Sequence, residues 1–265
     1  MTPEPPFVNT GYDAAARVYD LEYPECTGAE LEFLASFAGS ERAQVLELAT
    51  GTGRVAIALA RLGHEVTGLD ISEGMLARAQ ARRDRLNADL ARRLTFTRAD
   101  MAEFQLEANF DLVVAAFNAL LLLSGGKTRS RCLKASLAHL RPGGWLVADV
   151  FAANALDRMP DHETVEFLET EPESGRRVTR ERFYSYDETS DRGQSRLIYR
   201  LYDADSHVAE QLQLGYSLAL MSRDDVVREV DAAGFADITT YGDHHKAPWT
   251  PASPNLLVCA RRPDR

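Results

Sequence analysis

Short apolar runs alternate with amphipathic stretches through the middle of the chain. Buried strands are predicted at 45–48, 65–70, 94–97, 110–115 and 145–150, with helices between them at 55–62, 72–86 and 129–140. Apolar strands separated by helices are typical of a mostly parallel sheet that is covered on both faces. In such a sheet a ligand binds beyond the carboxyl ends of the strands.

Two further regions flank this alternation. Before it, residues 12–20 and 28–37 have apolar positions at helical spacing and are separated by Pro24, which predicts two short helices packed on the core. Tyr12, Tyr19 and Tyr23 add a second interpretation, because three phenols close together are suited to a lid over a ligand site.

After the fifth strand the pattern changes to period two. Four strands are predicted at 162–170, 176–187, 194–202 and 208–220, separated by clusters of turn-forming residues. They indicate an antiparallel insertion. Ser222 then begins a helix that ends near Gly234, and two strands at 238–241 and 255–260 close the chain.

Composition and charge narrow the function classes. The 265 residues are 45% hydrophobic and carry a net charge of −10, which argues against a protein that follows a nucleic-acid backbone. No apolar run has the length of a membrane span, and the N-terminus lacks the pattern of a signal peptide. Three widely spaced cysteines without a CxxC pair favour a reducing compartment, and no metal site is predicted. We therefore expect a cytoplasmic protein.

The candidate chemistry lies where three strands end. Gly51 and Gly53 follow the first strand and leave backbone N–H groups free for an anion at the start of the next helix. Asp70 ends the second strand, where a carboxylate can accept hydrogen bonds from both hydroxyls of a ribose. Asp100 and Met101 follow the third strand and suit the edge and face of an adenine.

Two nucleotide-binding interpretations remain open on these residues. Gly51-x-Gly53-x-x-Ala56 with Asp70 further on also fits the dinucleotide fingerprint of an NAD(P)-dependent oxidoreductase. None of the three lysines stands four residues after a tyrosine, so the Tyr-x-x-x-Lys pair of short-chain dehydrogenases is absent. The acidic residue before the turn, Glu47, is one that dehydrogenase turns do not require.

The whole set of motifs resembles the class I S-adenosylmethionine-dependent methyltransferases, in their small-molecule branch. The matching elements are Glu47-x-x-x-Gly51-x-Gly53, Asp70 with Ile71-Ser72-x-x-Met75, Asp100-Met101, Phe110-Asp111-Leu112-Val113 and Leu140-Arg141-Pro142-Gly143-Gly144. The N-terminal Tyr12-Asp13-x-x-Ala16-x-x-Tyr19-Asp20 is similar to the lid helix of the same branch. One departure is Ala49, which stands where most relatives have glycine.

The resemblance implies a cofactor, S-adenosylmethionine, and the residues that contact it. Gly51 and Gly53 flank its methionine part, Asp70 its ribose, Ile71 and Met75 its adenine, and Asp100 and Met101 the amino edge; Tyr12, Tyr19, Ala49 and Phe117 complete the predicted set. It also implies a fold: an α/β, Rossmann-like, seven-stranded, mostly parallel sheet with a reversed last strand. Within one domain we expect lid helices at 1–40, the cofactor core at 41–151, the β insertion at 152–221 and the closing helix and hairpin at 222–265.

The predicted activity is transfer of a methyl group to an O or N nucleophile of a small molecule by in-line displacement. Residues 116–123 lack the proline pair of nucleic-acid amino-methyltransferases. The lid and the insertion should form the acceptor site, and the insertion is also a candidate surface for pairing two copies into a homodimer. The alternatives are a protein that binds the cofactor without methyl transfer and the oxidoreductase.

No catalytic residue is assigned from the sequence, because leucine occupies the position where some relatives have a histidine. His244 and His245, between the last two strands, are candidate bases, and His207 is a weaker one. His64 and His139 lie in connections at the opposite end of the sheet, so we expect them at the surface. Six carboxylates between 161 and 173 predict a solvated face or, if they face the pocket, a site that attracts a cationic amine.

Overall fold

A computed structural model describes residues 10–264 except 24, 40, 41, 151–161, 172, 188 and 190. In the first half of the chain the elements are α1 (Tyr12–Glu22), α2 (Gly28–Ala35), β1 (Gln44–Leu48), α3 (Arg54–Arg61), β2 (Glu65–Asp70), α4 (Glu73–Asp84), α5 (Ala88–Ala91), β3 (Leu94–Arg98), β4 (Phe110–Ala115) and α6 (Ala119–Leu122). The second half contains α7 (Gly126–His139), β5 (Leu140–Val150), β6 (His162–Thr170), β7 (Arg177–Asp187), β8 (Arg192–Tyr202), β9 (Val208–Ala219), α9 (Arg223–Ala232), β10 (Ala236–Tyr241) and β11 (Leu256–Arg261).

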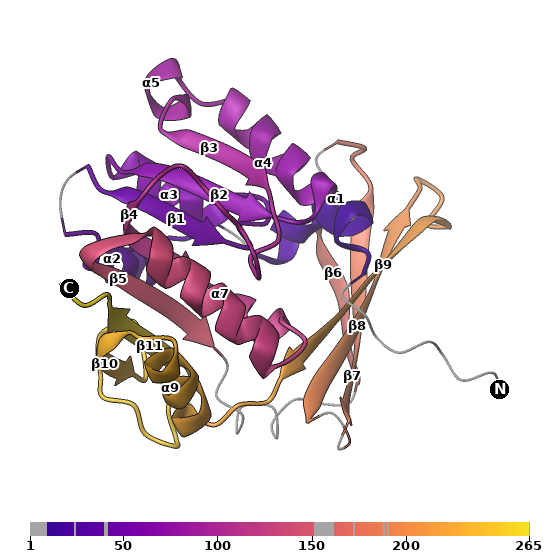
Figure 1. Cartoon of the computed structure of the whole chain (residues 1–265). Coiled ribbons are helices and arrows are strands. Elements are labelled where there is room, and N and C mark those ends of the chain that lie inside the picture. The colour runs from indigo at the N-terminus through magenta and orange to yellow at the C-terminus, as the bar shows by residue number, and fades with distance from the viewer. Residues whose placement is uncertain are drawn as a thin grey trace.

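The larger sheet has the strand order β10-β11-β5-β4-β1-β2-β3 (Figure 1). Its first five strands in sequence pair in parallel, and β11 runs antiparallel to both β5 and β10. The predicted fold class is confirmed, including the reversed last strand. The chain moves to opposite sides of β1 to form β2 and β4, so the crevice between β1 and β4 is the expected ligand position.

Helices cover both faces of this sheet because most of its strand positions are apolar. On one face α2 and α3 pack through Phe33, Ile57 and Leu59, all nearly or fully buried. On the other face α7 and α9 pack through Leu133 and Val230. Figure 1 shows α7 and α9 on the same side of the sheet. Helix α9 follows Ser222, as predicted, and begins with a capping box in which Ser222 and Asp225 exchange hydrogen bonds.

The insertion forms a second sheet of order β6-β7-β8-β9, antiparallel throughout and steeply inclined to the first (Figure 1). Its inner face packs on α1, with Ala15 and Val18 of the helix against Leu197 and Leu214 of the strands. Burial alternates at every residue along β8, as period-two patterning requires. Helix α1 therefore lies between the two sheets and contacts both α4 and β9.

The largest differences from the predicted boundaries are at α7 and β5. Helix α7 begins at Gly126, and β5 begins at Leu140 rather than at 145. The short helices α5 and α6 were not predicted, because four residues are too few to show a helical period. The start of the insertion, predicted at 152, lies outside the described residues. Within the described part of the chain, no helix combines the length and the apolar character needed to cross a bilayer.

Candidate functional site

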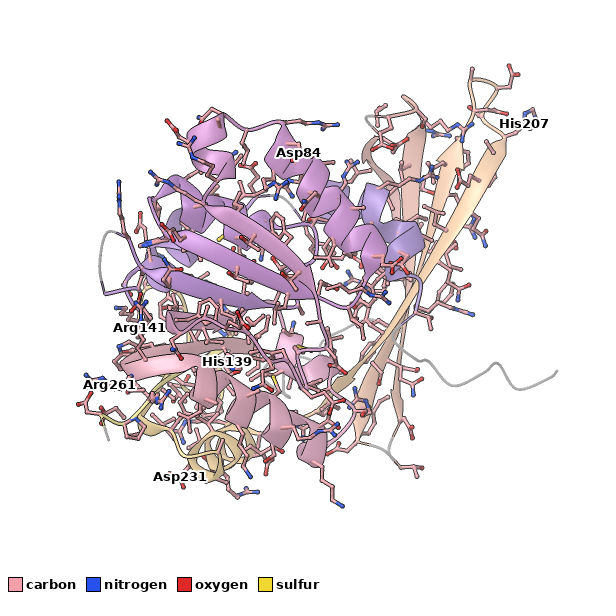
Figure 2. The ribbon with its side chains drawn as sticks, turned by 45° about the horizontal axis from the view of Figure 1, so that its top comes forward. Asp84, His139, Arg141, His207, Asp231 and Arg261 are labelled. Carbon is pink, nitrogen blue, oxygen red and sulfur yellow. The ribbon has the colours of Figure 1, made fainter. Side chains whose placement is uncertain are left out.

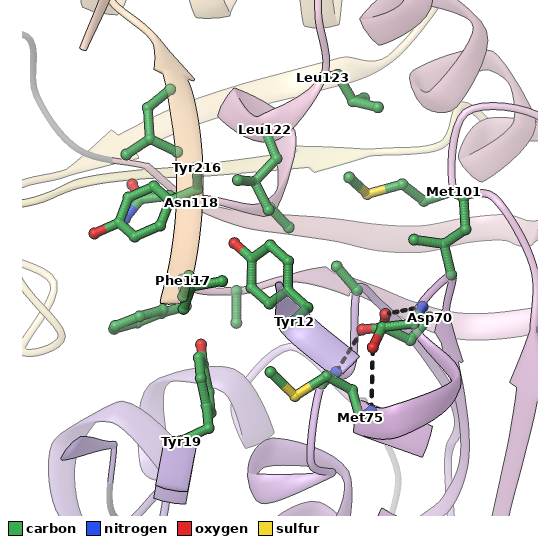
Figure 3. Close-up of a pocket in the computed structure, with 18 of the residues that line it drawn as sticks. Tyr12, Tyr19, Asp70, Met75, Met101, Phe117, Asn118, Leu122, Leu123 and Tyr216 are labelled. Carbon is green, nitrogen blue, oxygen red and sulfur yellow. Dashed lines mark hydrogen bonds between the residues drawn. The ribbon is translucent and has the colours of Figure 1, made fainter. Parts of the chain in front are cut away.

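A cavity of about 550 Å³ opens at the carboxyl ends of β1, β2, β3 and β4 and extends to the inner face of the second sheet. Ten of the eleven predicted cofactor residues line it: Tyr12, Tyr19, Ala49, Gly51, Asp70, Ile71, Met75, Asp100, Met101 and Phe117. Figure 3 shows six of them around the cavity: Tyr12, Tyr19, Asp70, Met75, Met101 and Phe117. The tertiary structure thus brings together residues that the sequence places more than 100 positions apart.

The loop after β1 borders the cavity with backbone atoms and small side chains. Ala49 and Gly51 both have left-handed backbone, with φ of 51° and 57°. A Cβ added at Gly51 would meet no atom within 4 Å, so it would project into open space at the cavity wall. Fully buried Glu47 holds this loop, since its carboxylate accepts hydrogen bonds from Thr50 Oγ1 (2.5 Å) and the Ala56 N–H (3.0 Å). Burial raises the pKa of Glu47 to about 7.

Gly53, the eleventh predicted residue, does not line the cavity. It lies at the N-cap of α3 with φ of 78°, and a Cβ there would come within 2.9 Å of the Phe96 ring and 3.3 Å of Ala79. Glycine is required at position 53 because the turn packs closely against β3 and α4. The structure therefore gives Gly53 a packing role that accounts for its identity without a ligand.

Asp70 ends β2 with its carboxylate in the cavity wall. Oδ2 accepts a hydrogen bond from the Gly51 N–H (2.8 Å), and Oδ1 accepts one from the Ser72 N–H (2.9 Å). Burial raises the pKa of Asp70 above its ordinary value, and these backbone donors oppose that shift. The carboxylate is oriented by the two loops that follow β1 and β2 (Figure 3).

An apolar slot lies beside this carboxylate. Ile71 is 62% exposed, an unusual position for a large aliphatic side chain, and it faces the same cavity as buried Met75 and half-buried Met101. Asp100 closes the slot, with one carboxylate oxygen accepting from the Ala102 N–H (2.8 Å). A planar apolar group with a polar edge would fit between these residues.

Helix α1 covers the cavity and is anchored by its acidic residues. Asp13 accepts hydrogen bonds from Ser72 Oγ (2.6 Å) and the Gly74 N–H (2.7 Å), and Asp20 accepts one from Thr52 Oγ1 (2.5 Å). Tyr12 and Tyr19 of the same helix face the cavity. Burial raises the pKa of both phenols, so they stay neutral and serve as hydrogen-bonding groups.

The far end of the cavity was largely missed from the sequence. Its lining residues come from the end of α1, the stretch around α6, and the inner face of β7, β8 and β9: Tyr23, Asn118, Ala119, Leu122, Leu123, Arg182, Tyr184, Gly193, Ser195, Leu214, Tyr216 and Leu218. Ser72, Ala99 and Ala116 line the cavity elsewhere. Apolar residues at every second position between 212 and 220 predicted that Leu214, Tyr216 and Leu218 lie on one face of a strand. The pattern does not show which part of the protein packs against that face.

Strained backbone separates the two ends of the cavity. Phe117 and Asn118 follow β4 with φ of 54° and 66°, a conformation that non-glycine residues seldom adopt and that gathers at functional sites. The Phe117 ring packs edge-on against Tyr23 at 4.8 Å between centroids, and the Arg54 guanidinium lies 5.3 Å from its centre. Arg54 is itself held by both carboxylate oxygens of Glu30.

Comparison with known proteins agrees with this architecture. Residues 45–144 match a family model described as a methyltransferase domain. This segment of the chain is thus similar to a methyltransferase domain. This confirms the resemblance drawn from the motifs, over the segment from β1 to β5. A candidate methyltransferase of Bacillus subtilis (strain 168), YqeM, is 34% identical over 114 residues, which are 43% of this chain and 44% of YqeM. The chain thus matches less than half the length of that relative.

Solved structures extend the likeness beyond the methyltransferase domain. The CcbJ methyltransferase from Streptomyces caelestis is 24% identical with a TM-score of 0.79, covering 97% of this chain and all of CcbJ. The glycopeptide N-methyltransferase MtfA, complexed with S-adenosyl-L-methionine, is 25% identical with a TM-score of 0.58, covering 90% of this chain and 88% of MtfA. The insertion and the α1 cover are therefore included in a fold that these proteins share.

None of the five histidines whose side chains the structure describes, 64, 139, 207, 244 and 245, lies among the residues that line the cavity. The surface position expected for His64 and His139 is wrong: both are buried, and each accepts a backbone N–H at a ring nitrogen, from Ala43 (3.3 Å) and Leu106 (2.9 Å) respectively. Figure 2 shows His139 within the body of the molecule and His207 at the far tip of a hairpin. His244 packs on Phe33 at the opposite side of the sheet from α7.

The carboxylate run between 161 and 173 does not face the cavity where its side chains are described. Glu163 pairs with Arg180 and Arg182, Glu173 pairs with Arg78, and Glu171 accepts hydrogen bonds within its own turn. Neither a metal-binding group of His, Cys, Asp and Glu side chains nor a disulfide occurs among the described residues. The cavity chemistry thus depends on hydroxyls, amides, two carboxylates and one guanidinium.

Proposed function

We propose that this protein is an S-adenosylmethionine-dependent methyltransferase that acts on an amine nitrogen of a small molecule. The observation that carries the proposal is one continuous cavity with two chemically different ends. One end holds the Asp70 carboxylate, the bare loop at Gly51 and the apolar slot. The other end is walled by a separate sheet and has the space for a second molecule.

The first end fits S-adenosylmethionine in shape and donor set. Gly51 leaves room for the methionine part, Asp70 can accept from ribose hydroxyls, and Met75 lies in the slot suited to adenine. When bound, that molecule supplies a methyl group on a sulfonium: the acceptor lone pair forms the new bond to carbon, the carbon–sulfur bond breaks with its electrons on sulfur, and an amine product releases its extra proton to solvent. MtfA, which was solved with the same molecule, supports this assignment.

Nitrogen is favoured over oxygen because no general base is in place among the described lining residues. The carboxylates lining the cavity, Asp70 and Asp100, lie at the first end, and backbone N–H groups hold both. Burial raises the pKa of Tyr12, Tyr19 and Tyr23, which keeps these phenols protonated. A neutral amine already has its lone pair, whereas a hydroxyl normally loses its proton to a base. MtfA is named an N-methyltransferase, in agreement with this choice.

The protein's own contribution is then to position and desolvate the acceptor. The second end is lined largely by apolar carbon, and burial in such surroundings favours the neutral amine over the ammonium. Holding two reactants in line can supply roughly 7–11 kcal/mol of the barrier. Helix α1, anchored through Asp13 and Asp20, contributes Tyr12 and Tyr19 to the wall of the site.

Isotope transfer tests the proposal. The protein, incubated with S-adenosylmethionine labelled in its methyl group and a mixed panel of primary amines and alcohols, should label amines and leave the alcohols unlabelled. Cofactor binding without transfer to any acceptor would favour the alternative of a binding protein. Labelled alcohols with unlabelled amines would contradict the nitrogen assignment, and quenching or enhancement of NAD(P)H fluorescence would favour the oxidoreductase.

Asp70→Ala tests the cofactor end separately. Loss of a charged hydrogen-bond acceptor should weaken binding of S-adenosylhomocysteine by about 10- to 100-fold in calorimetry. Asp84→Ala, on the solvent-exposed end of α4, is the matched control and should bind normally. Unchanged affinity of a folded Asp70→Ala protein would remove the ribose contact from the proposal.

A further inference from the structure

The second end of the cavity has the character of a hydrophobic pocket. Leu122 and Leu123 approach it from the α6 segment, and Leu214 and Leu218 from β9. The rings of Tyr23, Phe117, Tyr184 and Tyr216 fill much of the remaining wall. Most of the surface that an acceptor would touch is therefore aliphatic or aromatic carbon.

Charge is scarce at this end among the described lining residues. The cationic group there is Arg182, and its guanidinium donates to Glu22 (2.7 Å), with Glu163 at 3.6 Å. Glu22 is almost completely buried and also pairs with Arg180, so these two arginines and two glutamates form a balanced set. Arg182 therefore offers little net attraction to an anionic acceptor. Of the described lining residues, no carboxylate faces this end to attract a polycationic acceptor.

Among the described residues at this end, the polar side chains are set in a surface that is mostly carbon: Tyr23, Asn118, Arg182, Tyr184, Ser195 and Tyr216. Two of these side chains, Asn118 and Ser195, are buried. A sugar has several hydroxyls that lose their water on entering the cavity, and each one left without a partner costs free energy. An apolar body gains free energy from the same transfer.

We propose that the methyl acceptor is an amine carried on an apolar, ring-containing body, of the arylalkylamine type, and not a polyhydroxylated amine. The proposal rests on the proposed function and adds the class of acceptor to it. The amine end lies toward Phe117 and Asn118, where the two ends of the cavity meet, and the body lies against Leu214 and Leu218.

A series of phenylalkylamines of increasing chain length tests the proposed acceptor class directly. Benzylamine, 2-phenylethylamine, 3-phenylpropylamine and 4-phenylbutylamine are titrated into the protein saturated with S-adenosylhomocysteine, which cannot donate a methyl group. Each added methylene should strengthen binding about fourfold until the pocket is filled. Glucosamine serves as the hydroxylated amine and should bind more weakly than 4-phenylbutylamine by over about tenfold. Equal or tighter binding of glucosamine overturns the proposal.

Variants of the cavity wall in β9 and α6 test where the hydrocarbon chain of the amine binds. Leu214→Asn should remove most of the gain per methylene. Leu122→Asn, at the half-buried residue of α6, provides a second wall variant if the first does not fold. Leu212→Asn makes the same change on the same strand and face but outside the cavity, so it should retain the full series. If each added methylene still strengthens binding to the same extent in both wall variants, the placement of the apolar body in this pocket is contradicted.

Transfer assays separate this proposal from the proposed function. With labelled S-adenosylmethionine, kcat/KM for 4-phenylbutylamine should exceed that for glucosamine by over about tenfold. Absence of transfer to every amine, together with the expected binding series, would overturn the proposed function and leave the hydrophobic pocket supported. Efficient transfer to glucosamine in preference to the arylalkylamines would support the function and overturn the acceptor class.

Discussion

Single residues at this site show how burial sets chemistry. Glu47 is an acidic side chain with 3% exposure in the first strand of the core, and two donors hold it in place beneath the glycine loop. Its position explains why an acid there is useful: the carboxylate fixes both Thr50 and the first turn of α3, so the loop that borders the cavity is held from below. Asp149 is a second case, since burial raises its pKa to about 6.

The raised pKa of Glu47 predicts how stability depends on pH. The folded value is about 7 against an ordinary 4.5, so the folded protein holds a proton that the unfolded chain releases between these values. The stabilisation is complete below pH 4.5 and is lost as pH rises through 7. Between pH 5 and 8 the free energy of unfolding should fall about 2–3 kcal/mol more in the wild type than in Glu47→Gln.

Urea unfolding at a series of pH values measures this difference. Glu32→Gln, at an exposed carboxyl of α2, should keep the wild-type profile. Parallel profiles for the wild type and Glu47→Gln would mean that Glu47 is not the group that takes up the proton. Asp149 contributes a slope of the same sign, which remains in both proteins.

Elements meet at the site through the close approach of α1 to α4. The approach is possible because residue 74 is glycine: a Cβ there would lie 2.5 Å from the carbonyl oxygen of Asp13. Asp13 then accepts from Ser72 Oγ and the Gly74 N–H, at the helix end where backbone donors are unpaired. Helix α1 is thus attached to the cofactor side by a side chain that caps the neighbouring helix.

Removing that attachment should loosen α1 without unfolding the core. In Asp13→Ala, backbone amides of 12–22 should exchange with deuterium about fivefold faster, as expected for loss of a capping carboxylate. Ala14→Ser changes an exposed residue of the same helix and should leave exchange unchanged. Full protection in Asp13→Ala would show that the apolar contacts of α1 are enough to hold the helix in place.

Two expectations from the sequence stay predictions. They are the division of the chain at 40, 151 and 221, and the pairing of two copies through the insertion.

At the scale of the whole molecule, α1 and α6 both pack on β9 of the second sheet. The apolar face of α1 packs on the second sheet, and Glu22 at its end accepts a hydrogen bond from Tyr199 Oη (2.8 Å) at the centre of that sheet. Tyr199 is fully buried. The ligand cavity lies where these parts meet, so its shape depends on how α1 is seated between them.

Two tyrosines with the same bond but different burial test this arrangement. Tyr199→Phe removes a hydroxyl that donates to a buried carboxylate and should lower the free energy of unfolding by about 2 kcal/mol. The Tyr186 hydroxyl also donates a hydrogen bond of 2.8 Å to a carboxylate, that of Asp191, but Tyr186 is 49% exposed. Tyr186→Phe should therefore lower the free energy of unfolding by less than about 0.5 kcal/mol. Chemical denaturation gives both values. Similar losses in the two variants would show that burial of the Glu22 pair is unimportant.

The order of elements and most of the cofactor end follow directly from the amino-acid sequence. Apolar runs, glycine turns and strand-end acids act locally, and parallel strands bring their carboxyl ends to one edge, so the pattern alone suffices to place Gly51, Asp70 and Asp100 together. The period-two pattern of the insertion also located its four strands to within about two residues.

What the second sheet faces, and which residues complete the cavity, depend instead on tertiary packing. Period two separates the two faces of a strand but does not say which layer covers either one. Leu214 and Tyr216 therefore become cavity residues only because β9 packs on α1 and α6. The burial of His64 and His139 and the packing role of Gly53 have the same cause: each depends on a neighbour distant in sequence.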